Sequence, residues 1–347
     1  MVYLPPAEEW RWDVFARSHP RRSIFQFDCW RAVLQSAFRH LRGRPLVVRD
    51  VASETIVAGT MVYEATSWLL GRRLISVPFA SYMDPLVSEP WQISAIARSL
   101  SSTKAVGRYR HAELRLLKVK EAPCFGFVMR HPFKHHYLDL TQGTETLHRR
   151  FSRTAIRHRI RDADRDGVVV RSGGEDDWDR FWRLHRNARR RLGLPVMPRR
   201  FFDALRYHLS LDNLSLLFAE QNGKAIAASL ALVFDGVYLY EWTGDSRDAH
   251  SKGARQRLLW GAMCDAADRR CHTFSLGRTD VNNTGLLAYK RRWRPTEEDV
   301  VILTSEDAEA QLVHRDRRHD WFARGLMRRV PDPMYSVMSE FCYRHLG

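Results

Sequence analysis

Apolar residues recur every three or four positions in some stretches of this chain and every second position in others. The first spacing is typical of amphipathic helices and the second of half-buried strands. Helical spacing is found in residues 1–44, which we expect Pro45 to end, and in residues 90–106. Strand-like runs lie at residues 46–51, 55–63, 68–70, 74–77, 112–119 and 136–140. The first part of the chain is therefore predicted to be an α/β unit.

The remainder of the chain repeats this order of elements. Helices are predicted at residues 176–192, 199–209 and 253–269, and strands at residues 168–170, 214–220, 224–234, 237–242 and 300–304. Asn-Gly and Asp-Gly turns join the three central strands, and both turns favour tight hairpins. We therefore predict an α/β (α+β) fold with two tandem units, each a mixed, largely antiparallel sheet flanked by helices.

Residues 147–166 are predicted to form one continuous helix that Gly167 ends. Arginine recurs along this helix at intervals of four residues, at Arg149, Arg153, Arg157, Arg161 and Arg165. A stripe of this kind can follow a phosphate backbone. The alternative is an exposed helix whose charge is balanced by three aspartates, Asp162, Asp164 and Asp166. The sequence leaves both interpretations open.

Residues 274–293 hold the densest group of candidate binding residues. An apolar run leads to Gly277 and Arg278, and a polar loop then leads to a short predicted helix. That helix ends in aromatic and cationic residues, namely Tyr289, Lys290, Arg291, Arg292 and Trp293. Open α/β sheets bind ligands where their strands end, and arginine and lysine suit anionic groups. The stretch therefore predicts an anion site, with a solvated helix end as the alternative.

The composition favours an anionic partner. The chain has 347 residues, enough for two ordinary domains, and carries a formal charge of +16 with a pI near 10.1. Such a charge suits nucleic acid, a nucleotide-linked substrate or an anionic membrane surface. A GC-rich coding sequence, which favours arginine, would give the same excess.

Five scattered cysteines without a Cys-x-x-Cys pair indicate reduced thiols. The histidine spacing predicts no metal site, and the N-terminus lacks the basic and apolar regions of a signal peptide. No window approaches the roughly 18 uninterrupted apolar residues of a membrane span. The expected location is cytoplasmic, with peripheral contact at the inner membrane face as a further option.

Three motifs resemble the FemAB-like branch of the GNAT acyltransferase superfamily. The first pairs residues 274–278 with residues 289–293, which match the apolar-Gly-Arg turn and the aromatic-Lys-Arg-x-Trp segment of that branch. The others are residues 191–196 followed by Phe201 and Phe202, and residues 76–82. The resemblance spans residues 20–300, and it is greatest to FemAB-related proteins that accompany exosortase and exopolysaccharide loci.

The resemblance implies two GNAT-like domains with a substrate groove between them. The implied division is an N-terminal domain of residues 1–145, an arginine-rich linking helix of residues 146–166, a C-terminal acyltransferase domain of residues 167–310 and a helical extension of residues 311–347. The implied reaction moves an acyl or aminoacyl group to an amine of a cell-wall or exopolysaccharide precursor. The donor would be acyl-CoA or aminoacyl-tRNA, without a metal.

GNAT enzymes that use CoA usually hold its pyrophosphate with a Gly-rich turn at a helix N-terminus, where amide groups are free. The matching place keeps Gly253 and Ala254 beside Lys252 but lacks the full glycine pattern. CoA therefore remains an option, and the arginine stripe favours a bulkier donor such as tRNA. The remaining donor contacts implied are Arg278, Tyr289, Arg291 and Arg292.

Acyl transfer to an amine needs a neutral amine, a polarised carbonyl and a route for the released proton. Glu241 ends a strong predicted strand and is a candidate base, because burial would raise its pKa. A salt-bridged surface glutamate is the alternative. Lys290 and Asp280 complete the predicted catalytic set, and Asp280 could instead simply pair with Arg278. Lys290 matches the family lysine that holds the charge of the donor.

The acceptor is expected to contact Tyr82, Asp84 and Trp242 across the groove. The chain shows no Ser-His-Asp order and no activated cysteine, so direct transfer without a covalent intermediate is the simpler mechanism. A second function stays open from the sequence, namely a non-catalytic RNA- or polyanion-binding protein built on a GNAT frame.

Overall fold

The computed structural model describes residues 2–118, 126–247, 249, 253–305, 325 and 327–345. Its strands are β1 (Val2–Tyr3), β2 (Leu41–Arg49), β3 (Ile56–Ser67), β4 (Gly71–Ile75), β5 (His111–Leu116), β6 (Phe127–Asp139), β7 (Val169–Ser172), β8 (Leu214–Gln221), β9 (Lys224–Phe234), β10 (Val237–Asp245), β11 (Thr273–Asp280) and β12 (Thr296–Ser305). Its α-helices are α1 (Trp10–Ser18), α2 (Asp28–Ala37), α3 (Pro90–Val106), α4 (Thr144–Arg150), α5 (His158–Arg165), α6 (Trp178–Arg191), α7 (Arg199–His208), α8 (Ala254–Asp268), α9 (Thr284–Arg291) and α12 (Asp332–His345).

All these strands belong to one mixed sheet, in the order β1-β2-β3-β4-β5-β12-β6-β11-β10-β9-β8-β7. Neighbouring strands are antiparallel except for β4 with β5 and β10 with β11. Each half of the chain thus runs through two helices, a three-stranded meander and a helix before a strand that is parallel to the last of the meander. The predicted α/β (α+β) class, with two tandem units of largely antiparallel strands flanked by helices, is confirmed, but the two units share one sheet instead of having one each.

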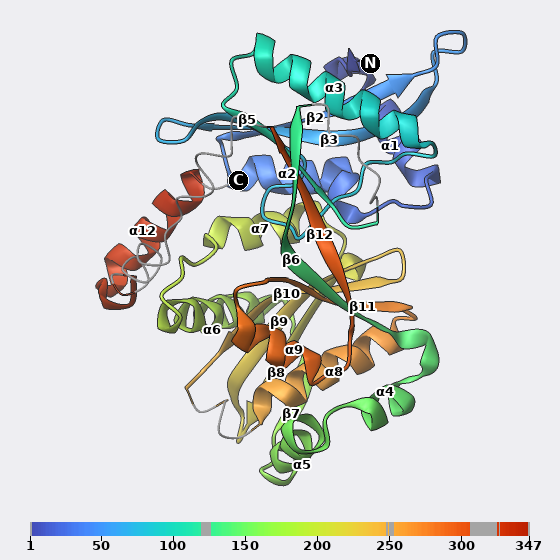
Figure 1. The fold of residues 1–347 in the computed structure, drawn as a ribbon. Helices are drawn as coiled ribbons and strands as arrows, with labels where there is room; N and C mark the ends of the chain where they lie inside the picture. Colours follow the sequence, from blue (N-terminus) through green and yellow to red (C-terminus); the bar gives the residue numbers. More distant parts are fainter. Residues whose placement is uncertain are drawn as a thin grey trace.

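The last strand of each half crosses into the other half. β6 closes the first half in sequence, yet it pairs with β11, and β12 closes the second half yet pairs with β5. The two strands also pair with each other, from Thr296 opposite Tyr137 to Ser305 opposite Phe127. Figure 1 shows β6 and β12 running between the two lobes. Backbone hydrogen bonds therefore continue from one lobe into the other.

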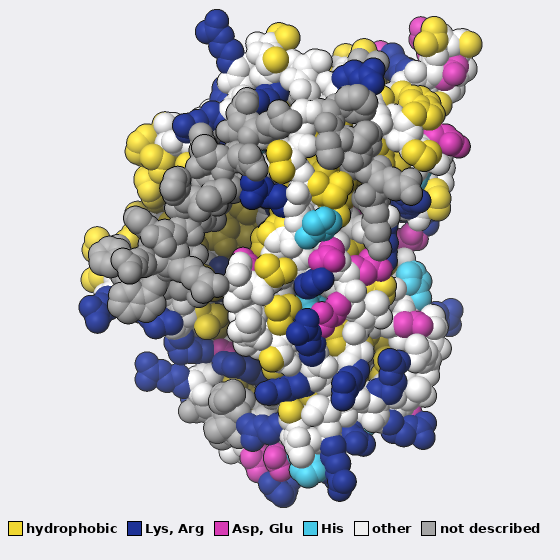
Figure 2. Space-filling model, viewed as in Figure 1, with side chains coloured by type: hydrophobic (Ala, Val, Ile, Leu, Met, Phe, Trp, Pro, Cys, Tyr) yellow, Lys and Arg dark blue, Asp and Glu magenta, His cyan; other side chains and the backbone are white. Residues whose placement is uncertain are grey.

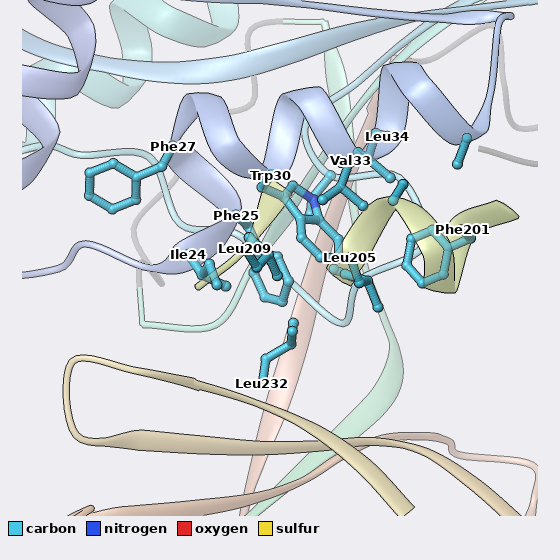
Figure 3. Close-up of a cluster of buried hydrophobic side chains, with 14 of the residues drawn as sticks. Ile24, Phe25, Phe27, Trp30, Val33, Leu34, Phe201, Leu205, Leu209 and Leu232 are labelled. Carbon is cyan, nitrogen blue, oxygen red and sulfur yellow. The ribbon is translucent and has the colours of Figure 1, made fainter. Parts of the chain in front are cut away.

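A shared hydrophobic core forms the second connection between the halves. Trp30 of α2 and Phe201 of α7 are almost fully buried, and their rings meet edge-on with centroids 6.2 Å apart. Figure 3 shows that side chains of α2 and α7 interleave above Leu232 of β9. Phe201 also contacts Trp242 of β10 at 5.3 Å. Burial of large aromatic groups on both sides couples the stability of the two lobes.

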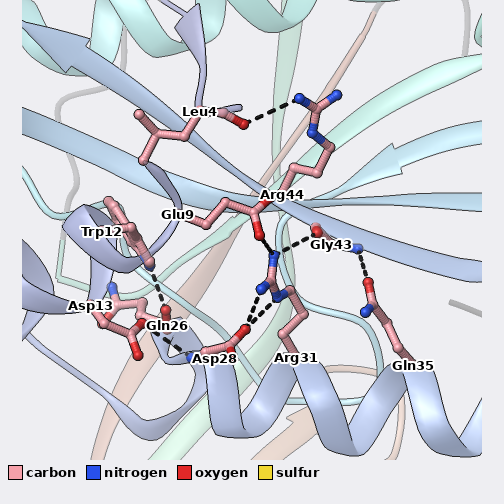
Figure 4. Close-up of polar contacts among 10 residues, drawn as sticks. All are labelled: Leu4, Glu9, Trp12, Asp13, Gln26, Asp28, Arg31, Gln35, Gly43 and Arg44. Carbon is pink, nitrogen blue, oxygen red and sulfur yellow. Dashed lines mark hydrogen bonds and ion pairs between the residues drawn. The ribbon is translucent and has the colours of Figure 1, made fainter. Parts of the chain in front are cut away.

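A polar cluster fixes the N-terminal segment against the first half. The guanidinium group of Arg31 pairs with Glu9 and Asp28 and reaches the carbonyl oxygen of Gly43 at 3.5 Å, as Figure 4 shows. The amide of Gly43 donates to Gln35 at 2.9 Å. A side chain at residue 43 would have no room, because a Cβ there would lie 2.6 Å from the ring of Tyr63.

α12 contacts both halves. The hydroxyl group of Tyr335 donates to the carbonyl oxygen of Leu194 at 2.6 Å, and His345 at the other end of the helix bonds to Ser67 at 2.8 Å. Arg186 and Arg190 pair with Asp332 at its start. In the parts of the chain that the structure describes, no helix has the length and apolar character required to cross a lipid bilayer.

Pro45 does not end a helix, as the sequence suggested, but lies inside β2 opposite Met61. The amide of Leu4 donates to the carbonyl oxygen of Pro45 at 3.1 Å. The backbone nitrogen and oxygen of a strand residue point to the same side, so the missing N–H of Pro45 faces the outer side next to Leu4. No bond to β3 is lost, and proline is tolerated there. Residues 68–70, predicted as a strand, form a turn between β3 and β4.

The predicted continuous helix over residues 147–166 was also wrong. α4 ends at Arg150, the backbone is extended at Phe151, and a π-helical turn over Arg153–Arg157 leads into α5. The side chain of Phe151 is buried against Trp293 and Trp260, with ring centroids 5.0 and 5.8 Å away. Burial of this aromatic ring favours the break, and it separates Arg149 from the later arginines.

We predict that Phe201→Ala lowers the free energy of unfolding by about 3–5 kcal/mol, because it empties a fully buried aromatic site. Tyr207→Ala on the same helix is the matched control, since that ring is 84% exposed, and its effect should stay within about 0.5 kcal/mol. Urea unfolding at one pH measures both. Equal losses in the two variants would contradict a core shared through α7.

Candidate active site

The parallel strands β10 and β11 part at the centre of the sheet. Their pairing runs from Val237 opposite Thr273 to Leu239 opposite Ser275, and β10 continues beyond it with its other edge on β9. Beyond the last pair, the facing edges of the two strands no longer bond to each other. A wedge with exposed backbone groups is a natural ligand site at the carboxyl ends of the strands.

A β-bulge lies on each side of this wedge. Glu241 is skipped in the register between β10 and β9, and Leu276 is skipped between β11 and β6. Gly277, next to the second bulge, has φ = 71°, which only glycine adopts without strain. Bulges bend a strand and redirect its side chains. Here they turn Glu241 and Arg278 toward the opening.

The wedge contains a cavity of about 200 Å³ that is closed by a loop from the first half. The lining residues come from this loop, from β10 and from β11: Phe79, Ala80, Ser81, Tyr240, Glu241, Leu276, Gly277 and Arg278. Phe79 has φ = 61°, an unusual value for a bulky residue, and its ring lies 4.6 Å from Phe38. Arg115 of β5 supports the loop by donating to the carbonyl oxygen of Val77 at 3.0 Å.

Lys290 reaches the floor of this region from α9. Its ammonium group donates to the carbonyl oxygens of Gly277 at 2.9 Å and of Arg278 at 3.3 Å. The side chain is only 8% exposed. Burial lowers the pKa of Lys290 to about 8, and the nearby Glu241 opposes that change. The geometry places Lys290 as a support for the Gly277 turn.

Arg278 connects the wedge to the loop of the first half. Its amide faces the hydroxyl oxygen of Ser81 at 3.4 Å, and its guanidinium group lies 4.4 Å from the ring centre of Phe133. Burial and the charge of Arg115 lower the pKa of Arg278 to about 10, whereas Glu113 and Glu241 raise it. The guanidinium group thus remains charged at neutral pH in a largely dry place.

Glu241 is the carboxyl group of the cavity. Burial raises its pKa, and the positive charges of Arg278 and Lys290 lower it to a smaller extent. Because the effect of burial exceeds that of the two cations, this carboxylate accepts a proton more readily than an exposed glutamate does. Glu241 is therefore suited to general base chemistry.

β6 places two histidines behind the cavity. His135 is buried, its Nε2 lies 3.3 Å from the hydroxyl oxygen of Ser275, and its ring meets Tyr82 edge-on at 5.0 Å. Burial and Lys290 lower the pKa of His135 to about 3 and that of His136 to about 4. Both imidazoles are neutral at physiological pH. Burial, with Asp84 and Glu298 as further causes, raises the pKa of Tyr82.

The structure does not bring all predicted residues to the cavity. Asp280 lies exposed at the end of β11, where it accepts the amide of Asn282 at 2.7 Å. Asp84 is buried and accepts the amides of Leu117 at 2.8 Å and Lys118 at 3.1 Å, so it fixes the end of β5. Trp242 faces the core around Phe201. For each of these three residues, the contacts just given account for a structural role.

The other predicted donor contacts surround α9 and the start of α8. Arg291 is exposed and pairs with Glu297 at 2.7 Å, Arg292 is exposed, and Tyr289 packs against the core of the second half. Gly253 has φ = 66°, and a Cβ there would lie 2.1 Å from the carbonyl oxygen of Arg159.

Ala254 at the start of α8 is fully buried. Its amide already donates to the carbonyl oxygen of Ala249 at 3.1 Å. The predicted contact Lys252 lies outside the described residues.

Sequence reasoning missed three contributors to the site. From the loop of the first half it selected Tyr82 and Asp84 rather than Phe79 and Ser81. It assigned no role to His135. Nothing in the sequence shows that β6 would lie beside β11. Among the described residues, no cluster of His, Cys, Asp or Glu could hold a metal ion.

The family comparison covers this site. Residues 150–291 match the model of the acetyltransferase (GNAT) domain, a range that includes Glu241, Arg278 and Lys290. This part of the chain is therefore similar to a GNAT acetyltransferase domain. A comparison with curated protein sequences found no match.

Several solved structures share this fold. FemX has 11% sequence identity, covers 91% of this chain and 100% of its own, and superposes with a TM-score of 0.65. The C-terminal domain of a proposed lysylphosphatidylglycerol synthetase from Agrobacterium fabrum has 16% identity, coverage of 90% and 95%, and a TM-score of 0.56. A tandem GNAT protein from the clavulanic acid biosynthesis pathway has 14% identity, coverage of 88% and 98%, and a TM-score of 0.51. The chain thus shares its fold with FemX and with a tandem GNAT protein, in agreement with the resemblance that the motifs indicated.

The lowered pKa of Lys290 predicts a change of stability with pH. Between pH 8 and about 10.4, the usual lysine pKa, the unfolded chain binds a proton that the folded chain has lost. Stability therefore rises with pH across this window. Relative to Lys290→Met, the wild type should gain on the order of 2–3 kcal/mol in the free energy of unfolding between these limits.

Urea unfolding at a series of pH values measures this difference. Lys224→Met is the matched control, because Lys224 lies exposed at the start of β9 and has no contact with the cavity. It should follow the wild-type curve. A constant difference between wild type and Lys290→Met at every pH would contradict burial of a charged lysine.

Proposed function

We propose that this protein transfers an acyl or aminoacyl group from an anionic carrier, acyl-CoA or aminoacyl-tRNA, directly to an amine of a cell-wall or exopolysaccharide precursor. The observation that carries the proposal is the cavity between β10 and β11, where Glu241 and Arg278 line one small space above the Lys290 support. The loop of residues 79–81 closes it, so both halves contribute to the site.

The size of the cavity supports a division between the reacting group and its carrier. A volume of about 200 Å³ is smaller than the usual ligand pocket of roughly 300–1,000 Å³. Only the acyl end and the attacking amine would fit inside. The carrier would lie outside, where the net charge of +16 favours an anion.

The residues present can perform each proton and charge step. The amine attacks the carbonyl carbon of the acyl group, and Glu241 accepts the proton that the amine releases. Arg278 stabilises the negative charge that develops on the carbonyl oxygen. The carbonyl carbon then breaks its bond to the carrier, whose sulfur or oxygen leaves with the electron pair and takes up the proton that Glu241 accepted. Lys290 keeps the Gly277 turn in position for these steps.

The choice of donor rests on the start of α8. A CoA cradle needs free amides at a helix N-terminus, but the amide of Ala254 is already bonded and the backbone of α5 packs on Gly253. These contacts favour aminoacyl-tRNA over CoA. The fold shared with a proposed lysylphosphatidylglycerol synthetase, whose name denotes an aminoacylated product, agrees with this choice.

The proposed enzyme has two domains, residues 1–145 and 167–310, which are linked by residues 146–166 and extended by residues 311–347. A cytoplasmic enzyme with peripheral contact at the inner membrane face would have access to envelope precursors. A purely binding protein would gain little from burying Glu241, Arg278 and Lys290 together, because burying charges is costly.

We expect Glu241→Gln to lower kcat by roughly 10²–10⁴-fold, because the amide cannot accept the proton. KM for the donor should change little, and the acid limb of the pH profile of kcat/KM should disappear. Steady-state assays with acetyl-CoA, longer acyl-CoAs and charged tRNA, each with an amino sugar as acceptor, measure these quantities.

Asp280→Asn is the matched control, because it removes an exposed carboxylate a few residues from the cavity. Its kcat should stay within about threefold of wild type, since surface changes have small effects. If Glu241→Gln transfers at the wild-type rate, or if Asp280→Asn abolishes transfer, the assignment of the base is wrong.

A further inference from the structure

A second cavity lies away from the β10–β11 wedge, among α4, the π-helical turn and α5. Its volume is about 420 Å³, within the usual range of ligand pockets. The described residues that line it are His148, Arg153, Arg157 and Arg161, and the first cavity shares none of them. Figure 2 shows many Lys and Arg side chains on the lower lobe, where Figure 1 places α4 and α5. We call this cavity the basic pocket.

The charges of the basic pocket are not neutralised within the described part of the chain. No carboxylate there pairs with Arg153, Arg157 or Arg161, and the buried Nε of Arg157 has no hydrogen-bond acceptor. Two of the three aspartates that might have balanced the stripe are engaged elsewhere. Asp162 pairs with Arg165 at 3.0 Å, and Asp164 pairs with Arg257 at 2.6 Å. An unpaired buried donor is costly unless a ligand satisfies it.

The backbone geometry brings the arginines together. In an α-helix, side chains four residues apart point in slightly different directions. The wider π-helical turn over Arg153–Arg157 changes that difference between Arg153 and Arg157. The hydroxyl group of Ser152 caps this turn by accepting the amide of Ala155 at 3.4 Å. π-Helical turns are rare and are frequent at functional sites. The turn is a second observation that supports a binding site here.

The basic pocket is held against two rigid elements. The ring of His148 lies 5.0 Å from that of Trp260 on α8. Just before the turn, Phe151 packs on Trp293, and the amide of Ser152 donates to the carbonyl oxygen of Arg292 at 2.9 Å. Arg292 and Trp293 directly follow the helix that carries Lys290. A preorganised cluster loses less entropy on binding than flexible surface arginines would.

We propose that the basic pocket binds the phosphate groups of a ligand with two or more phosphates. Three guanidinium groups can each form bidentate bonds to phosphate oxygens, and the imidazole of His148 adds a further polar partner. A ligand with a single carboxylate would neutralise only one of the three positive charges. A pyrophosphate-sized anion matches both the charge and the volume. Binding here does not depend on acyl transfer at Glu241.

The test uses the full-length protein and inorganic pyrophosphate as the probe, measured by isothermal titration calorimetry. Wild type should bind pyrophosphate saturably with one site. Arg157→Gln should raise the Kd by about tenfold or more, because it removes charge-assisted hydrogen bonds. If pyrophosphate does not saturate the wild type up to millimolar concentration, the proposal is overturned.

Arg165→Gln is the matched control. Arg165 continues the four-residue spacing on α5, and its substitution changes the net charge by the same amount as Arg157→Gln. Arg165 pairs with Asp162, however, and does not line the pocket. Its Kd should stay within about twofold of wild type. Equal weakening by Arg165→Gln and Arg157→Gln would mean that net charge alone binds the anion, and would overturn the proposal.

A folding defect can be separated from a binding defect. Arg153 is exposed, so Arg153→Gln leaves the core untouched and carries the same test if Arg157→Gln does not fold. Circular dichroism and thermal unfolding check each variant. If Arg153→Gln folds and binds pyrophosphate with the wild-type Kd, Arg153 does not belong to the site. If Arg157→Gln is also unfolded, that result overturns the proposal.

Competition experiments identify the source of the phosphates. Adenosine diphosphate that displaces pyrophosphate would indicate a nucleotide ligand, and a short RNA hairpin that displaces it would indicate an RNA backbone. Displacement by neither, with saturable pyrophosphate binding, would leave the inorganic anion as the ligand. Glu241→Gln should bind pyrophosphate like wild type, so failure of the acyl-transfer proposal and failure of this one can be told apart.

Discussion

The exchange of β6 and β12 between the halves is the constraint on which the remaining structure depends. Each strand ends the sequence of one half but bonds to the fifth strand of the other, and the two also bond to each other. The lobes consequently cannot rotate freely as two domains on a flexible linker would. The core between α2 and α7 lies on one face of this arrangement and reinforces it. A site built from both lobes can therefore keep a defined geometry.

The candidate active site follows from what the exchanged strands leave unpaired. β11 pairs with β6 along its length, whereas β10 pairs with β9. Both therefore keep their partners while they part from each other, and the bulges at Glu241 and Leu276 increase the separation. The wedge is then closed by residues 79–81, which the first half supplies. Charged groups in this wedge are desolvated, and their pKa changes follow from burial first and from the neighbouring charges second.

The basic pocket differs from this site in its chemistry. The wedge combines one carboxyl group with two cations that interact with it, so its charges are partly satisfied internally. In the basic pocket the described lining residues supply only cations and an imidazole, and the neighbouring aspartates pair with Arg165 and Arg257. The first arrangement suits proton transfer, and the second suits retention of an anion. Trp293 and Arg292 connect them, because they follow α9 and contact the segment before the π-helical turn.

Turns and helices were predictable from the sequence wherever their formation depends on residues that are neighbours in the chain. The hairpin turns at Asn222-Gly223 and Asp235-Gly236 and the helix over residues 90–106 lie where spacing and turn residues placed them. Gly277 and Arg278, expected as a turn at the end of a strand, instead lie inside β11 beside its bulge. Phe151 shows the limit of this reasoning. Its helical spacing was favourable, but the chain breaks there because a partner far away in sequence, Trp293, offers burial. Pro45 shows the same limit, since only the position of Leu4 makes a proline acceptable in β2.

The sequence by itself determined the types of element, their repeated order, the positive charge and the family motifs at residues 274–293. Only the tertiary structure decided that β6 lies between β11 and β12, that Ser81 lines the cavity with Glu241, and that Asp84 fixes the end of β5 instead. The physical reason is the range of the interactions. Turn preference and helical spacing act within a few residues, whereas these contacts join residues from 33 positions apart, for Asp84 and Leu117, to 197 apart, for Ser81 and Arg278, and no local pattern encodes them.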